Sequence, residues 1–179
     1  VGGEGEHKCI NYIRFHGDPT DSYCIHGLDA DLIMLALGTH RPNFWILRDD
    51  LYDSRNEFFL LDIGTTRTDL SYLINWNEGN EEVTERVVEF DPASAINDFI
   101  FICFMVGNDF LPHIPSLEII EGGIDQMLDV YKNVGEIYGH LTHVVDDQVL
   151  FRKSSLEVFL GTIGQYDKGI LEDKLLHKD

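Results

Sequence analysis

The sequence predicts an α/β fold in which a mainly parallel sheet with flanking helices is followed by a mostly helical C-terminal part. Over roughly the first 110 residues, short apolar runs typical of strands alternate with segments whose apolar residues recur at helical spacing. The chain has 179 residues, 44% of them apolar, which is enough for a packed core. We therefore expect an α/β core at 1–110, with an acidic insert at 75–89, and a helical extension at 111–179.

The first half of the chain opens with a helix. Segment 6–15, EHKCINYIRF, places Cys9, Ile10, Tyr12 and Ile13 on one helical face, and the Gly-Asp-Pro run after it ends the helix. Further along, strands are expected where aromatic and β-branched residues cluster, and helices where the apolar period is 3.6 residues. The expected strands are 23–28, 43–48 and 57–63, and the expected helices are 29–37 and 66–76.

The second half reads as helical, after an insert that we interpret as a solvated acidic loop. A strongly apolar segment ends at a Gly-Asn-Asp turn, and the segments after it have apolar residues at helical spacing. The expected helices are 92–106, 121–131, 154–163 and 168–176, with a loop over 135–147 and a short strand at 148–151.

The composition limits the functional classes. The formal charge of −19 argues against a nucleic-acid-binding surface, which needs Lys and Arg, but suits hard cations. The sequence has neither an apolar run long enough to span a bilayer nor a signal-peptide pattern at its start. Three separated cysteines without a CxxC pair predict buried structural thiols in a reducing, intracellular compartment. Whether that compartment is the nucleus or the cytoplasm stays open.

Five carboxylates at three points of the chain are candidates for one cation site: Glu4, Glu6, Asp29, Asp31 and Asp109. The first two pairs have i, i+2 spacing, which keeps both side chains on one side of an extended segment. The fifth follows a buried helix, where an ionised carboxylate is costly unless it is paired. Such oxygen ligands suit Mg²⁺ or Mn²⁺, and two such ions can promote phosphodiester cleavage.

Each of these acids also has an ordinary structural interpretation. Glu-x-Glu at a helix start is favoured by the helix dipole, and Asn-Asp at a helix end is often a plain turn. The Asp-x-Asp pair lacks the further positions of an EF-hand. From the pattern alone, a divalent-metal site and a set of unrelated surface acids both stay open.

Three sequence blocks resemble the signature blocks of the XRN 5′→3′ exoribonucleases. They are Gly3–Lys8 (GEGEHK), Gly27–Leu35 (GLDADLIML) and Phe104–Glu118 (FMVGNDFLPHIPSLE), in the family's order. The resemblance continues into 121–132 and so covers most of the chain.

The resemblance implies a nuclease core related to the flap-endonuclease and PIN-like enzymes, with 1–110 as the C-terminal half of that core. It implies two Mg²⁺ or Mn²⁺ ions and processive hydrolysis of single-stranded RNA from a 5′-monophosphate end to mononucleotides. The metal-binding carboxylates of the family fall on Glu4, Glu6, Asp29, Asp31 and Asp109. His113, close to Asp109 in the sequence, is expected to hold the turn rather than to contact substrate.

The resemblance also implies that part of the site is elsewhere. The family's catalytic region begins before the GEGEHK block, and that part supplies further metal-binding aspartates and the basic residues that hold the 5′ phosphate. We expect the isolated chain to be inactive and to need this N-terminal part as its partner. Two alternatives stay open: a structure-specific flap-type endonuclease, and an inactive nuclease-like scaffold that binds a protein partner.

Overall fold

A computed structural model describes residues 3–49, 58–77, 88–107 and 123–176, and for 166–176 only the helical backbone. The chain forms two compact units, Val1–Tyr72 and Leu73–Asp179. The elements of the first unit are α1 (Gly5–His16), β1 (Tyr23–His26), α2 (Ala30–Leu37), β2 (Phe44–Asp49), β3 (Phe58–Asp62) and α3 (Ile63–Leu73). Those of the second are α4 (Pro92–Met105), α5 (Gly123–Tyr138), β4 (Thr142–Val145), β5 (Gln148–Phe151) and α6 (Lys153–Leu176).

The α/β class is confirmed, but the described sheet of the first unit is mixed rather than mainly parallel. Its strand order is β1-β2-β3, with β1 parallel to β2 and β2 antiparallel to β3. The parallel pair is joined through α2, as a crossover requires. Only residues 50–57 separate β2 from β3, fewer than the dozen or so that a parallel crossover needs, so β3 returns antiparallel.

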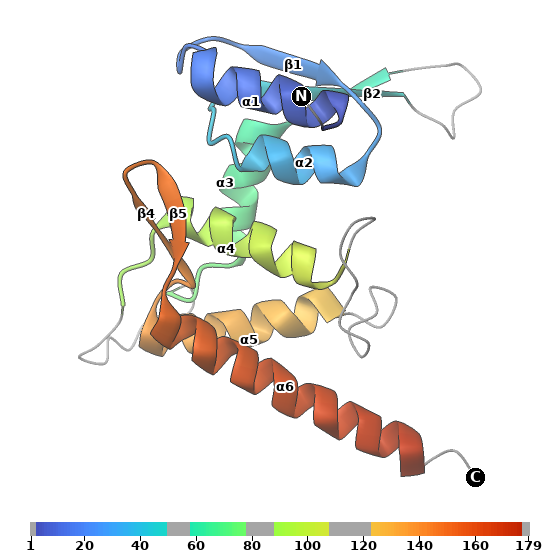
Figure 1. Cartoon of the computed structure of the whole chain (residues 1–179), viewed down its shortest axis with the longest axis vertical. Coiled ribbons are helices and arrows are strands. Elements are labelled where there is room, and N and C mark those ends of the chain that lie inside the picture. The colour runs from blue at the N-terminus through green and yellow to red at the C-terminus, as the bar shows by residue number, and fades with distance from the viewer. Residues whose placement is uncertain (1–2, 50–57, 78–87, 108–122, 177–179) are drawn as a thin grey trace. The chain divides into compact units, whose positions relative to one another are not determined.

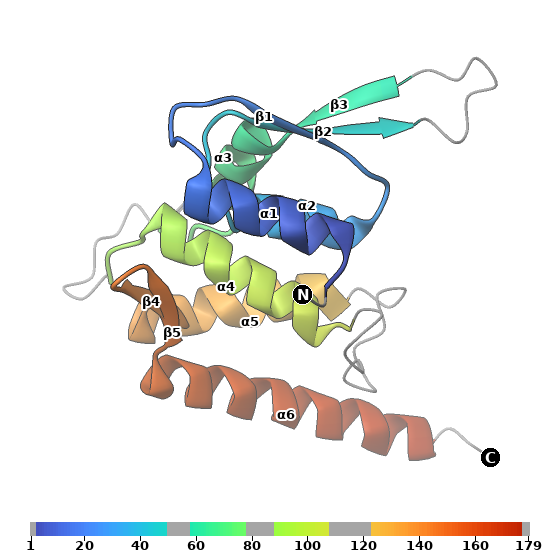
Figure 2. The same ribbon diagram turned by 45° about the horizontal axis from the view of Figure 1, so that its top comes forward.

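One face of this sheet is covered and the other is open. Helices α1, α2 and α3 lie on the same side of the strands (Figures 1 and 2). Phe44 and Ile46 of β2 are fully buried. The register puts the alternate residues on the opposite face, which includes exposed apolar side chains such as Phe58 and Leu60 of β3. No other element of the described part of this unit covers that face.

Helix α1 buries a narrower stripe than its sequence predicts. Ile10 and Ile13 are buried, but Tyr12 is 65% exposed and Cys9 is also exposed. The prediction of buried thiols is therefore wrong for Cys9 and Cys24, and holds in part for Cys103, whose pKa burial raises to about 11. For Cys9 the reason is that α1 packs along a single line of contact, so only every third or fourth residue is enclosed.

The second unit contains α4, α5 and α6 with a two-stranded antiparallel hairpin. The strand expected at 148–151 is confirmed, but its partner β4 lies where a loop was expected. The two helices expected at the C-terminus form one helix, α6, because neither Gly161 nor Gly164 breaks it. A single glycine costs a helix only about 1 kcal/mol, which neighbouring turns can offset. None of the described helices is both long and apolar enough to cross a membrane.

A buried carboxylate lies at the centre of the second unit. Asp98 of α4 is fully buried and accepts hydrogen bonds from Tyr131 Oη (2.9 Å), the Leu141 backbone N–H (2.9 Å) and Thr142 Oγ1 (2.6 Å). His140 Nδ1 lies 3.2 Å from the same carboxylate. Asp98 therefore links α4 to the middle of α5 and to the start of β4.

The hydrogen bonds fix the tautomer of His140. The Asp91 backbone N–H donates to Nε2 at 2.8 Å, so a neutral ring carries its hydrogen on Nδ1, toward Asp98 and Tyr131 Oη (3.0 Å). Burial, and then the charge of Asp98, raise the pKa of Tyr131, which keeps its hydroxyl a donor. Trp76 packs against the His140 ring with centroids 4.6 Å apart. We call Asp98, Tyr131, His140 and Thr142 the Asp98 cluster.

Candidate metal centre

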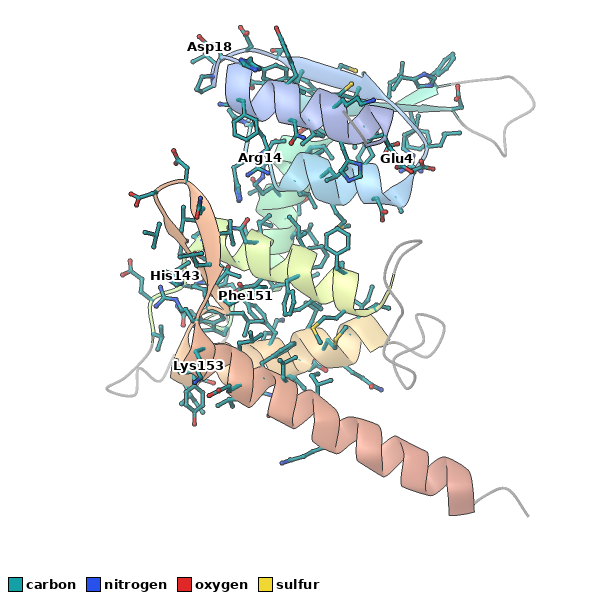
Figure 3. All side chains as sticks on the ribbon, viewed as in Figure 1. Glu4, Arg14, Asp18, His143, Phe151 and Lys153 are labelled. Carbon is teal, nitrogen blue, oxygen red and sulfur yellow. The ribbon has the colours of Figure 1, made fainter. Side chains whose placement is uncertain are left out.

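The first two helices begin side by side. Helices α1 and α2 are in contact, and their N-terminal ends lie at the same end of the unit (Figures 1 and 2). Glu4 is the N-cap residue of α1 and Asp29 that of α2, both with extended backbone, and neither side chain accepts a capping hydrogen bond. Figure 3 shows Glu4 at this end of α1. The unpaired N–H groups and the dipoles of two helix starts favour negative charge here.

Glu6, in the first turn of α1, meets Asp29 across this junction. The pKa of Glu6 is raised, first by partial burial, then by the charge of Asp29 and by a hydrogen bond between the two carboxyl groups. The charge of Glu4 raises it further, while His7 acts in the opposite direction. Two carboxyl groups can share a hydrogen bond only if one holds a proton. A cation at the same place would remove this repulsion and release the proton.

Glycine lets the Leu32 side chain of α2 pack closely on the turn that follows β1. A Cβ built on Gly27, just after β1, would lie 3.8 Å from Glu6 Oε1 and 2.6 Å from the Leu32 side chain. A bare backbone at this position leaves room for the Leu32 side chain of α2, while Glu6 would be at an ordinary contact distance. The sequence motif Gly-Leu-Asp-Ala-Asp thus has a local role: the glycine makes space and the next-but-one residue supplies the facing carboxylate.

The predicted site residues fall into three groups. Glu6 and Asp29 meet at the two helix starts, and Glu4 is near enough for its charge to act on Glu6. Asp31 lies in the first turn of α2, so the argument that placed it beside Asp29 on an extended chain does not apply. Asp109 and His113 are outside the described residues. Among the residues that are described, no three His, Cys, Asp or Glu side chains gather closely enough to hold a metal.

Sequence reasoning missed the contacts that hold the turn before Asp29. The Gly27 N–H donates to the Leu47 carbonyl at 3.1 Å, and Arg48 Nη2 donates to the Leu28 carbonyl. An arginine in a strand does not by its residue type indicate such a role. The signal that could have been used is its position at the end of the strand paired with β1.

Two family models match the chain. The one described as "XRN 5'-3' exonuclease N-terminus" matches residues 1–50, and the one described as "Xrn1 helical domain" matches residues 89–179, just over half of the chain.

Curated relatives give the same assignment. The 5'-3' exoribonuclease 2 of Yarrowia lipolytica is 40% identical over 145 residues, which are 74% of this chain and 14% of the relative. The protein of that name from Saccharomyces cerevisiae is 36% identical over 199 residues, 97% of this chain and 20% of the relative. The Gallus gallus protein of that name is 37% identical over 169 residues, which are 74% of this chain and 18% of the relative. The chain thus spans a fifth or less of the length of these relatives. The resemblance of the three sequence blocks is confirmed, and the chain belongs to the XRN family of 5′–3′ exonucleases.

Proposed function

We propose that this chain is part of a divalent-metal-dependent 5′→3′ exoribonuclease that degrades single-stranded RNA with a 5′ monophosphate to mononucleotides. Glu4, Glu6, Asp29, Asp31 and Asp109 would hold two Mg²⁺ or Mn²⁺ ions. The observation that carries this proposal is the contact between Glu6 and Asp29, two acids brought together from separate elements at two helix starts. The names of the relatives, 5'-3' exoribonuclease 2, supply the substrate class.

The donor set fits the ions. Carboxylate oxygens are the ligands that Mg²⁺ and Mn²⁺ prefer, and these ions usually keep several waters, so two or three protein carboxylates are enough for each. When bound, the ions activate the attacking water and stabilise the leaving oxygen. The chain's own contribution is to hold Glu6 and Asp29 facing each other at a junction where their charges otherwise repel. For His113 the proposal keeps the role of holding the turn after Asp109, with substrate contact as the alternative.

We propose that the rest of the active site comes from the N-terminal part of the same enzyme. Only residues 1–50 match the N-terminal family model, and this chain is a small share of each relative. The uncovered sheet face, with Phe58 and Leu60 exposed, is an apolar surface on which such a part could pack. The division into a core at 1–110 and a helical extension at 111–179 belongs to the same proposal.

The test is a nuclease assay on single-stranded RNA that bears either a 5′ monophosphate or a 5′ hydroxyl. The chain alone should release nothing. The chain joined to the upstream segment should release mononucleotides from the monophosphate substrate, and only with Mg²⁺ or Mn²⁺. Asp29→Asn should reduce the rate by about 10²-fold or more, because it removes a ligand from the ions that carry the chemistry.

The matched control is Asp69→Asn, which removes an exposed carboxylate on α3 in the same unit and should leave the rate unchanged. Internal cleavage of branched DNA would favour the flap-type endonuclease instead. An inert longer protein, together with no effect of Mn²⁺ on the melting temperature of the chain, would favour a scaffold, since a ligand that binds only the native state must stabilise it.

A further inference from the structure

Three consecutive residues at the end of β2 hold the segment that leads to Asp29. The Leu47 carbonyl accepts from the Gly27 N–H at 3.1 Å, which extends the β1–β2 ladder by one residue. Arg48 Nη2 donates to the Leu28 carbonyl, and Asp49 Oδ2 lies 3.2 Å from His26 Nε2. The chain is therefore tied to β2 at each residue before Asp29.

The middle contact acts closest to the site. Leu28 has an exposed side chain (39%), so packing does little to fix it, and its carbonyl belongs to the peptide bond that continues into Asp29. The backbone at Asp29 is extended and its side chain does not cap α2. The Arg48 guanidinium, from β2, holds the peptide that leads into Asp29.

We propose that Arg48 is a positioning residue of the metal centre: by holding the Leu28 carbonyl, it keeps the Asp29 carboxylate facing Glu6. The inference rests on the proposed function, because it assigns Arg48 a role at that same site. Groups that orient metal ligands from outside the ligand set commonly contribute 10–100-fold to metal affinity. Arg48 donates to a carbonyl oxygen, so its effect on the ion is through geometry.

Loss of the Arg48 charge and loss of its contact with the Leu28 carbonyl should change cation binding in opposite directions. Removing a positive charge from beside the residue that precedes Asp29 strengthens the binding of a cation by Coulomb's law. Losing the orientation of Asp29 weakens it. We therefore expect Arg48→Met to weaken Mn²⁺ binding to the full 179-residue chain about tenfold, measured by electron paramagnetic resonance titration of free Mn²⁺. Arg48→Lys keeps the charge and one donor, and should fall between wild type and Arg48→Met.

Arg14→Met is the matched control. It removes the same charge from an exposed position farther along α1 (Figure 3), and it should not weaken Mn²⁺ binding. A second readout needs no metal: amide hydrogen exchange at residues 27–29 should become faster in Arg48→Met, and unchanged in Arg14→Met.

The outcomes distinguish failure of the positioning role of Arg48 from failure of the proposed metal centre. Equal or tighter Mn²⁺ binding by both Arg48 variants, with unchanged exchange at 27–29, would overturn the positioning role while leaving the metal centre standing. No Mn²⁺ binding by the wild-type chain, or by the chain joined to the upstream segment, would overturn the proposed centre itself, and the exchange rates would then decide alone whether Arg48 orders the turn. If Arg48→Met fails to fold, Arg48→Lys carries the same comparison.

Discussion

Two places in the molecule hold a carboxylate close to other polar groups, and those groups are of opposite kinds. In the second unit, Asp98 is fully buried and its neighbours are hydrogen-bond donors from the backbone and from the side chains of Tyr131 and Thr142. In the first unit, Glu6 is only partly buried and its close partner is another acid, Asp29. The more buried group is thus the better satisfied one.

The difference separates structural acids from candidate ligands. A carboxylate whose lone pairs are all taken by protein donors stabilises the fold and has none left for a ligand. Two carboxylates directed at each other weaken the fold unless something cationic joins them. A polar residue's partners therefore say more about its role than its burial does.

The largest effect should come from removing the satisfied acid. Asp98→Ala would leave the Tyr131 hydroxyl, the Leu141 N–H and the Thr142 hydroxyl buried without their acceptor. Breaking a buried, hydrogen-bonded charge network costs about 3–5 kcal/mol, a large share of the stability of a small domain. Urea unfolding followed by circular dichroism measures this loss.

Asp129→Ala is the control for this comparison, because Asp129 is an exposed acid on α5 in the same unit. It should change the free energy of unfolding by no more than about 0.5 kcal/mol. Similar losses in Asp98→Ala and Asp129→Ala would mean that the Asp98 cluster does not support the unit.

The next effect tests the packing around the cluster rather than its hydrogen bonds. Gly135 of α5 lies against Trp76, and an added Cβ would be 2.4 Å from Trp76 Cε3. Trp76 in turn packs on Tyr131 and His140 and donates from Nε1 to the Val88 carbonyl at 3.1 Å. Gly135→Ala should therefore cost about 1–3 kcal/mol, the usual range for overpacking, measured as the loss of unfolding free energy.

The control for this substitution is Gly161→Ala on α6. In the part of the chain that the structure describes, no atom beyond the backbone of its own helix turns lies within 4 Å of a Cβ at that position, so the methyl group meets no packed neighbour. Alanine there should stabilise the helix by up to about 1 kcal/mol through helix propensity. Equal effects at both glycines would show that the Trp76 ring yields easily and that the cluster tolerates movement.

The same contrast explains what the sequence could and could not predict about the fold. Helix starts are local features: Glu4 and Asp29 stand at the N-caps where the sequence places helices. The direction in which two strands pair is not a local feature. Strand β3 is antiparallel to β2 because the link between them is too short for a parallel crossover. The length of that link is known only when the ends of both strands are known. Strand β4 was missed although Thr142, Val144 and Val145 are residues that favour strands, because so short a segment shows no clear pattern until its pairing with β5 is known.

For the candidate site, the sequence motifs predicted that the acids of two helix starts lie close together. They did not predict the residues that orient these acids. The family blocks identified Glu6 and Asp29, whose proximity depends on two elements packing side by side. Arg48 acts through a backbone carbonyl, so its role leaves no pattern in the sequence. The Asp98 cluster was missed for a similar reason, since Asp98 and His140 are joined only by the fold.

The smallest effect should come from the unsatisfied acid, and it should have the opposite sign to that of Asp98. The pKa of Glu6 is raised in the folded chain, so the folded state binds this proton more tightly than the unfolded state does. Its contribution to stability is then present below the ordinary carboxyl pKa and is lost as the pH rises through the raised value. Glu6→Gln removes this dependence, so the variant should become more stable relative to wild type as the pH rises from 4 to 7.

The measurement is the free energy of unfolding against pH for wild type and Glu6→Gln, with Asp69→Asn to correct for the loss of one charge from the same unit. Mn²⁺ at neutral pH should restore stability to the wild type and do little for the variant, because a bound cation replaces the proton between Glu6 and Asp29. If the unfolding free energies of wild type and Glu6→Gln changed with pH in the same way without metal, the two carboxyl groups would not interact. If the free energy of unfolding of Glu6→Gln were lower than that of wild type at neutral pH, Glu6 would be an acid that the fold requires, as Asp98 is.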